Sequence, residues 1–371
     1  MKVLGLVLAG GRGSKLRPLT NIRASAALPV FGKYRAIDFT LSNMVNAGIS
    51  KVGIITQYSP RSLMDHIGSG KEWDLDRKQG GLFFLQPFFR LSSETIGYKG
   101  TADAIYQNMT ILKRGNEDFV LIGSGDHIYK MDFQKLFRAH IDSGTDITVL
   151  TVPAGEKPKE VVKCVSGRII GWYRDSEFPQ INEGEYLRES TGIYFINKFL
   201  LRELLFSSVP EGKDNLIDLF IDNINSLKIM EYMFDGYWRN LTTDIATYFR
   251  TNLDILDPEV RSELFYRHGK VYTKLKDLPP PKVTTTGKVM NALVSDGCII
   301  SGSVINSVIF RNTRILAGAV VKNSVIMEGC VIEEGARVEN VIMDKNSRVR
   351  SGRELYGDSG APAIVEKSGV I

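Results

Sequence analysis

The feature that most constrains the fold of this chain is a six-residue period near its C-terminal end. Aliphatic residues recur at this interval at Val320, Ile326, Ile332 and Val338, and small residues recur beside them in Gly329-Cys330 and Gly335-Ala336. One short turn of chain cannot bury its own apolar face, so several turns must stack. The period predicts a left-handed parallel β-helix. Alternation in an antiparallel sheet is the competing interpretation, and the regularly spaced glycines favour the β-helix.

The first two-thirds of the chain alternate apolar strands with helical stretches. We expect strands at Val3–Leu8, Lys51–Thr56, Phe119–Ile122 and Asp146–Val152, and helices at Phe39–Gly48, Thr101–Arg114 and Asp132–Ser143. Such alternation is typical of a mostly parallel sheet with helices on both faces. The predicted fold class is therefore α/β, with a Rossmann-like domain over residues 1–256, a proline-containing linker over 257–290 and the β-helix over 291–371.

Composition narrows the classes of function. The chain has 371 residues, 43% hydrophobic and 24% charged, as in ordinary globular proteins. Its net charge of +5 is scattered without a basic run, which favours an acidic small molecule over nucleic acid as a partner. The three cysteines lack metal-type spacing, no segment approaches roughly 18 consecutive apolar residues, and no signal-peptide pattern begins the chain. We expect a cytoplasmic protein without a membrane partner.

A glycine-rich loop directly follows the first predicted strand. It reads Ala9-Gly10-Gly11-Arg12-Gly13-Ser14-Lys15 and continues to Thr20. Its glycines let backbone N–H groups approach an anion closely, and its basic residues add positive charge. The spacing matches neither a Walker A loop nor a dinucleotide fingerprint, so a plain glycine turn is the alternative. The loop indicates a phosphorylated ligand, and Asp126 should lie at the same edge of the sheet because ligands bind beyond the carboxyl ends of parallel strands.

Five motifs in order resemble bacterial ADP-glucose pyrophosphorylase (glucose-1-phosphate adenylyltransferase), and the C-terminal repeat matches that family too. The motifs span Leu8–Thr20, Gly32–Phe39, Thr56–Tyr58, Gly100–Asn108 and Ser124–Tyr129, so the resemblance covers essentially the whole chain. It implies a GT-A-like nucleotidyltransferase domain in which a sugar 1-phosphate attacks the α-phosphorus of ATP. It also implies Mg²⁺ held by two aspartates. By resemblance, Asp126 is the retained catalytic and metal-binding aspartate, and the nucleotide-binding residues are Gly10, Gly11, Gly13, Gln57, Gly100 and Thr101.

Four departures from the family pattern fall where charge matters. Lys15 replaces an arginine that could grip phosphate with two hydrogen bonds. Ser25 replaces a lysine, Asp175 stands at the position of the lysine that binds the sugar phosphate, and Asn240 replaces the second metal-binding aspartate. Asp244 lies near enough in sequence to substitute for Asn240. With these changes we expect Mg²⁺ not to be bound productively.

These departures resemble the GlgD-type, non-catalytic subunit of the family. The expectation is a regulatory, catalytically weak or inactive subunit in glycogen biosynthesis, in a hetero-oligomer, most simply a tetramer, with a catalytic subunit; a homo-oligomer stays open. The resemblance implies a phosphorylated sugar or nucleotide effector, for which Arg23, Lys33 and Arg35 are candidates, with a solvated basic face as the alternative. The alternative functions are an active sugar-phosphate nucleotidyltransferase with a rebuilt site, and a sensing module without a subunit role.

Overall fold

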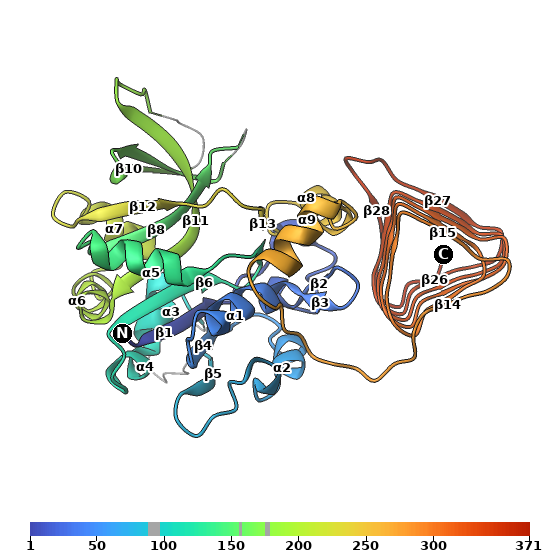
Figure 1. Cartoon of the computed structure of the whole chain (residues 1–371), viewed down its shortest axis with the longest axis horizontal. Coiled ribbons are helices and arrows are strands. Elements are labelled where there is room, and N and C mark those ends of the chain that lie inside the picture. The colour runs from blue at the N-terminus through green and yellow to red at the C-terminus, as the bar shows by residue number, and fades with distance from the viewer. Residues whose placement is uncertain (88–96, 156–157, 175–178) are drawn as a thin grey trace.

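The computed structural model describes residues 1–87, 97–155, 158–174 and 179–371, and shows an α/β domain beside a β-helix of triangular section (Figure 1). The α/β domain contains a nine-stranded sheet with the strand order β5-β4-β1-β6-β11-β8-β12-β10-β9. Its strands are β1 (Val3–Leu8), β4 (Lys51–Ile55), β5 (Gly81–Leu85), β6 (Phe119–Ser124), β8 (Ile147–Pro153), β9 (Glu160–Val165), β10 (Arg168–Arg174), β11 (Glu185–Asn197) and β12 (Ile229–Met233). Two short ladders pair β2 (Pro29–Val30) with β3 (Tyr34–Arg35), and β7 (His127–Tyr129) with β13 (Trp238–Asn240).

The main sheet is mixed, so the prediction of a mostly parallel sheet is wrong for its second half. Strands β5, β4, β1 and β6 pair in parallel, as do β8 and β12. Strand β11 instead runs antiparallel to β6, β8 and β9, and β10 runs antiparallel to β9 and β12. For β9 and β10 the physical reason is local: Ser166 and Gly167, both with positive φ (48° and 82°), form a tight hairpin turn that reverses the chain without a crossover helix.

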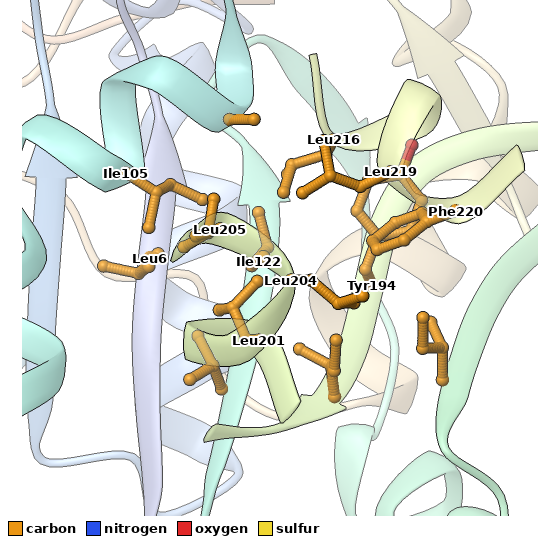
Figure 2. Close-up of a cluster of buried hydrophobic side chains, with 14 of the residues drawn as sticks. Leu6, Ile105, Ile122, Tyr194, Leu201, Leu204, Leu205, Leu216, Leu219 and Phe220 are labelled. Carbon is orange, nitrogen blue, oxygen red and sulfur yellow. The ribbon is translucent and has the colours of Figure 1, made fainter. Parts of the chain in front are cut away.

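Helices cover both faces of the sheet. They are α1 (Ala36–Asn46), α2 (Arg61–Ile67), α3 (Thr101–Gln107), α4 (Met109–Lys113), α5 (Phe133–Asp142), α6 (Lys198–Ser208), α7 (Leu216–Asp222), α8 (Ile245–Asp254) and α9 (Pro258–Ser262). Figure 2 shows the apolar cluster that joins α3, α6 and α7 to the sheet, with Leu6 and Ile122 from strands facing Leu201 and Leu205. A second cluster packs α1 and α5 on the sheet. Within the described part of the chain, no helix has the length and apolarity needed to span a bilayer.

The β-helix is built from three parallel five-stranded sheets, as expected for the predicted left-handed coil. One sheet stacks Val304, Val321, Val338 and Leu355 at a 17-residue repeat. The inward residue is therefore Val321, and the assignment of Val320 to the core is wrong. One corner of each turn is a residue shorter than the six-residue period requires; there Asn306, Asn323 and Asn340 take positive φ values of 46°, 44° and 54°.

The strands of these three sheets are short. The first contains β14 (Lys282–Val283), β17 (Ile299–Ile300), β20 (Arg314–Ile315), β23 (Val331–Ile332) and β26 (Arg348–Val349). The second contains β15 (Lys288–Met290), β18 (Ser303–Ile305), β21 (Val320–Lys322), β24 (Arg337–Glu339) and β27 (Glu354–Tyr356). The third contains β16 (Leu293–Val294), β19 (Val308–Ile309), β22 (Val325–Ile326), β25 (Val341–Met343) and β28 (Ala363–Val365). Because β14 starts at Lys282 and helical structure continues to Arg267, the extended connection is shorter than the predicted linker.

The two domains share an apolar cluster and a buried ion pair. Phe39 and Tyr248 of the first domain belong to the same buried cluster as Val325 and Ile342 of the β-helix. The Arg23 guanidinium donates to both carboxylate oxygens of Asp344, at 2.8 and 2.9 Å, and both side chains are 3% exposed. A bidentate pair of this kind fixes orientation as well as distance. The segment that follows the glycine loop is thereby anchored to the β-helix.

Removing one partner of the Arg23–Asp344 pair should destabilise the protein strongly, because an uncompensated charge would stay buried. We expect Arg23→Met to lower the free energy of unfolding by about 3–5 kcal/mol, and Arg23→Met/Asp344→Leu to recover most of that loss. Urea unfolding of the full chain measures both. Glu259→Gln, at the exposed Arg267–Glu259 pair, is the control, with an expected change within about 0.5 kcal/mol. If Arg23→Met were as stable as the wild type, this account of the interface would be contradicted.

Lys130 is fully buried, and its Nζ has no hydrogen-bond partner among the described residues. Burial lowers its pKa from 10.5 to about 8. Between those values the unfolded chain binds more protons than the folded one, so the free energy of unfolding rises as the pH increases from 8 towards 10.5. Lys130→Met should stabilise the protein by about 1–3 kcal/mol at pH 7. This gain in the free energy of unfolding should shrink as the pH rises above 8.

Thermal and urea unfolding at pH 7 and above pH 9 measure this difference between variant and wild type. Lys135→Met, at an exposed position on α5, is the matched control. A gain that does not change with pH, or no gain at all, would show that Lys130 is not a source of strain.

Candidate functional site

The carboxyl ends of β1 and β6 border a cavity of about 410 Å³. It brings together seven of the residues predicted from the sequence: Gly10, Gly11, Gln57, Gly100, Thr101, Asp126 and Asn240. Asn240 comes from β13, and the other six come from four of the five motifs, which the parallel half of the sheet places at one edge, as the strand pattern predicts. We call this the acidic cavity, for reasons given below.

Asp126 lies directly after β6, and its carboxylate is held by two hydroxyl groups. Ser25 Oγ donates to Asp126 Oδ2 at 2.7 Å, and Ser124 Oγ donates to Oδ1 at 2.5 Å. Ser25 is only 1% exposed, so this contact is part of the packed structure. His127 Nε2 lies 3.9 Å from Oδ1, but burial lowers the His127 pKa, so the ring is neutral near pH 7. Asp126 therefore has polar partners and no cationic partner among the described residues.

The β7–β13 ladder, in which Asn240 pairs with His127, brings Asn240 to the cavity. The backbone N–H of the next residue, Leu241, donates to the Asp126 carbonyl at 3.2 Å. Asn240 Oδ1 accepts from the backbone N–H and the hydroxyl of Thr242, at 2.9 and 2.7 Å. Asp244, the candidate substitute, caps α8 by accepting from the Thr247 N–H at 2.6 Å and does not line the cavity.

The residues present do not fit the Mg²⁺ that the family pattern implies. Mg²⁺ prefers carboxylate oxygens. Of the two positions that the resemblance implies for the metal, Asp126 is a carboxylate already hydrogen-bonded at both oxygens, and Asn240 is an amide already engaged with Thr242. In the described ranges no group of three or more His, Cys, Asp or Glu side chains could hold a metal ion.

The polar groups at the start of α3 are already hydrogen-bonded to the protein's own backbone. The N–H groups of Ala102 and Asp103 donate to the Asp214 carbonyl at 2.8 and 3.1 Å, and the Thr101 hydroxyl accepts from the Leu216 N–H at 2.9 Å. A Cβ at Gly100 would lie 2.4 Å from the same Asp214 oxygen, so the close approach requires glycine. These donors therefore hold the start of α7 in place instead of facing a ligand.

The glycine loop forms a tight turn, but its basic side chains do not line the acidic cavity. Gly13 has φ 58°, and its carbonyl accepts the Thr20 hydroxyl at 2.7 Å. Arg12 lies 4.7 Å above the Tyr58 ring, and Lys15 is exposed. Neither Gly13 nor Lys15 lines the acidic cavity, so their predicted nucleotide-binding and catalytic roles stay predictions.

Asp175 lies outside the described residues, and its role at the sugar-phosphate position also stays a prediction. Arg174 directly before it pairs with Asp218 on α7 at 2.9 Å. Arg174, the described basic residue next to Asp175 in the sequence, therefore already has an acidic partner.

The charge of the cavity is the property that sequence reasoning missed. Its described lining contains three carboxylates, from Asp126, Glu160 and Glu189, against one lysine, Lys159. Lys159 and Glu160 lie at the start of β9, Glu189 lies within β11, and none of the three belongs to a recognisable motif. Like charges repel, so each carboxylate of the lining that lacks a cationic partner opposes the binding of a multiply anionic ligand such as ATP.

A second cavity, of about 450 Å³, lies between the domains and has the opposite charge. Two predicted effector residues, Lys33 and Arg35, line it. The other basic residues in its lining are Arg61, Lys274, Lys276, Arg311, Lys345 and Lys367, against Asp65 and Glu328. We call it the basic cavity. Burial, together with the Arg35 charge, lowers the Lys345 pKa to about 8, although Lys345 pairs with Glu328 at 2.9 Å. The β-helix residues were missed because they lie hundreds of positions from Lys33.

Arg23, the third effector candidate, does not line the basic cavity. Both ends of its guanidinium are used by Asp344 in the buried pair between the domains. The family resemblance made it a candidate, but its side chain turns into the interface between the domains. Direct contact with an effector would require breaking that pair.

Comparison with known proteins agrees with the fold and with the motifs. Residues 4–257 match the nucleotidyl transferase family, and residues 279–361 match the GlmU-like, C-terminal hexapeptide family. Proteins named glucose-1-phosphate adenylyltransferase are similar over 86% of this chain. The one from Geobacillus stearothermophilus is 40% identical over 83% of its own length, that from Bacillus thuringiensis 39% over 85%, and that from Thermotoga neapolitana 39% over 76%. The chain therefore belongs to the nucleotidyl transferase family, in the group of ADP-glucose pyrophosphorylases (glucose-1-phosphate adenylyltransferases).

Proposed function

We propose that this chain is a regulatory, catalytically weak or inactive subunit of an ADP-glucose pyrophosphorylase in glycogen biosynthesis. The observation that carries the proposal is the environment of Asp126. Its carboxylate is hydrogen-bonded by Ser25 and Ser124, lies near the amide Asn240, and borders a cavity with three carboxylates and one lysine in its described lining. Nucleotidyl transfer gathers several negative charges, so it depends on the opposite arrangement.

The size of the expected loss follows from the number of charges involved. Removing one preorganised electrostatic contact typically costs about 10²–10³ in rate. Ser25 and Asn240 are two such positions in the described structure, while Lys15 and Asp175 add two more from the family pattern. The chain alone should therefore be slower than a catalytic homologue by at least about 10²-fold.

The proposal also implies a partner protein and an effector for this chain. The partner is a catalytic homologue, whose activity this chain changes by favouring one of its states. The simplest assembly is a mixed tetramer. The basic cavity is the proposed site for a phosphorylated sugar or nucleotide effector. Lys33, Arg35 and Lys345 place positive charges close together there, and a bound anion would reduce the repulsion between them.

The second candidate function is an active sugar-phosphate nucleotidyltransferase with a rebuilt site. It is favoured by the open cavity in which Gly10, Gln57, Gly100 and Asp126 still meet. The engagement of Asp244 as a helix cap counts against it, because that residue was the candidate to restore the missing carboxylate.

Two assays separate these functions. The purified chain, given ATP, glucose 1-phosphate and Mg²⁺, should form pyrophosphate at least about 10²-fold more slowly than a catalytic homologue. Mixed with that homologue, it should elute as a larger hetero-oligomer and change the homologue's rate or its response to a phosphorylated sugar. Turnover by the chain alone at the rate of the homologue would refute the proposal.

A variant pair sharpens the mixed assay. Lys33→Gln/Lys276→Gln should leave the hetero-oligomer intact but weaken the response to the phosphorylated sugar, because both residues line the basic cavity. Lys78→Gln/Lys135→Gln, at two exposed positions outside the basic cavity, is the charge-matched control. If no mixed species forms and the rate does not change, the subunit role fails even if the chain is inactive.

A further inference from the structure

We infer that the Glu328 carboxylate fills the anion site of the basic cavity from within, so that a phosphorylated ligand binds by displacing it from Lys276 and Lys345. This role of Glu328 rests on the proposed effector function of the basic cavity and adds what controls access to it. The contact is autoinhibitory, because the chain supplies an anion of its own that a ligand must replace.

Successive coils of the β-helix stack charged residues at one corner of the basic cavity. Arg311, Glu328 and Lys345 follow one another at intervals of 17 residues, and all three line the cavity. The Gly329 N–H donates to the Arg311 carbonyl at 3.0 Å. One coil further, the Asn346 N–H donates to the Glu328 carbonyl at the same distance. The backbone therefore fixes Glu328 between cationic residues of the two neighbouring coils.

Each oxygen of the Glu328 carboxylate accepts a hydrogen bond from a different lysine. Lys345 Nζ donates to Oε2 at 2.9 Å, and Lys276 Nζ, from the connection between the domains, donates to Oε1. Although burial opposes the charge of Glu328, the two lysines lower its pKa from 4.5 to about 2. The carboxylate is therefore ionised near neutral pH. Because lysine ammonium groups also bind phosphate oxygens, a phosphate and this carboxylate compete for the same partners.

Arg311 gives an independent indication that an anion from outside the chain completes this site. The residue is only 7% exposed, and its Nε has no hydrogen-bond partner among the described residues. In the described ranges, the ion pairs of Glu328 go to the two lysines and not to Arg311. Buried polar atoms in native structures are nearly always paired. A phosphate bound to Arg311 would lie beside the Glu328 carboxylate, and the repulsion between them would favour release of the carboxylate.

A phosphorylated ligand can displace Glu328 because it carries more charge than one carboxylate. Burial and the Arg35 charge lower the Lys345 pKa to about 8 even though Glu328 is its partner, so this carboxylate does not offset the surrounding positive charge. A phosphate group carries a charge of about −1.5 to −2 near pH 7 and has three acceptor oxygens. The Glu328 side chain is 23% exposed, so the released carboxylate can reach water.

Calorimetric titration of the full chain with inorganic phosphate and with glucose 6-phosphate tests this role. Glu328→Gln keeps the size of the side chain but removes its charge, so both probes should bind at least about tenfold more tightly than they bind the wild type. Glu334→Gln, at an exposed position of the β-helix outside the cavity, should leave both affinities unchanged. Equal affinities of Glu328→Gln and the wild type would overturn the inference.

Glu328→Asp separates displacement from repulsion at a distance. The variant keeps the charge, but its side chain is one methylene shorter and holds the two lysines less closely. Phosphate should therefore bind about threefold more tightly than it binds the wild type. Repulsion alone predicts no change, because the charge is still present, so an unchanged affinity in Glu328→Asp would contradict displacement.

Thermal unfolding gives a second measurement if Glu328→Gln is less stable than the wild type. Phosphate should raise the unfolding midpoint of Glu328→Gln by more than it raises that of the wild type. Equal binding by both proteins contradicts the role of Glu328 alone, whereas no binding by either contradicts the effector site as well. The turnover of the chain alone and its hetero-oligomer with the catalytic homologue, measured on the same samples, decide the regulatory role separately.

Discussion

The hydroxyl group of Ser25 on the Asp126 carboxylate is the contact on which the rest of the site depends. It joins the segment after the glycine loop to the end of β6 at 2.7 Å. Two residues earlier, Arg23 fastens the same segment to the β-helix through Asp344. This short stretch is therefore held from both sides, and the residue that faces Asp126 is neutral where the family resemblance implies a lysine. The Asp126 carboxylate, which is 14% exposed, is satisfied by hydroxyl groups and does not depend on the cations that nucleotidyl transfer requires.

The two cavities of the protein differ in the charge of their linings. The cavity beside Asp126 has an excess of carboxylates in its described lining, whereas the cavity between the domains is lined by eight basic and two acidic residues. Arg35 contributes to both the basic cavity and the segment near Asp126, since its guanidinium donates to the Ala27 carbonyl. The geometry thus connects the basic cavity to the region of Asp126 through one packed stretch of chain.

Much of this arrangement could be predicted from the sequence, because local patterns specify it. The strands Val3–Leu8 and Lys51–Ile55, the stacked coil, and the meeting of Gly10, Gln57, Gly100 and Asp126 all follow from periodicity and motif order. The antiparallel half of the sheet did not follow, because a two-residue turn sets the β9–β10 hairpin and tertiary pairing alone places β11 between β6 and β8. Val321 was missed because each coil has one shortened corner. Glu160, Glu189 and Lys345 were missed because tertiary contacts alone bring them to their cavities.

The most direct test of the central claim is Mn²⁺ binding to the full chain, followed by electron paramagnetic resonance. Wild-type protein should show no saturable site with a Kd below about 1 mM, because the Asp126 carboxylate is engaged and Asn240 adds no charge. Asn240→Asp should strengthen binding by about tenfold or more, since a second carboxylate restores the ligand type that such ions prefer. Tight binding by the wild type that Asp126→Asn abolishes would contradict the account, because it would mean that the metal site is still competent.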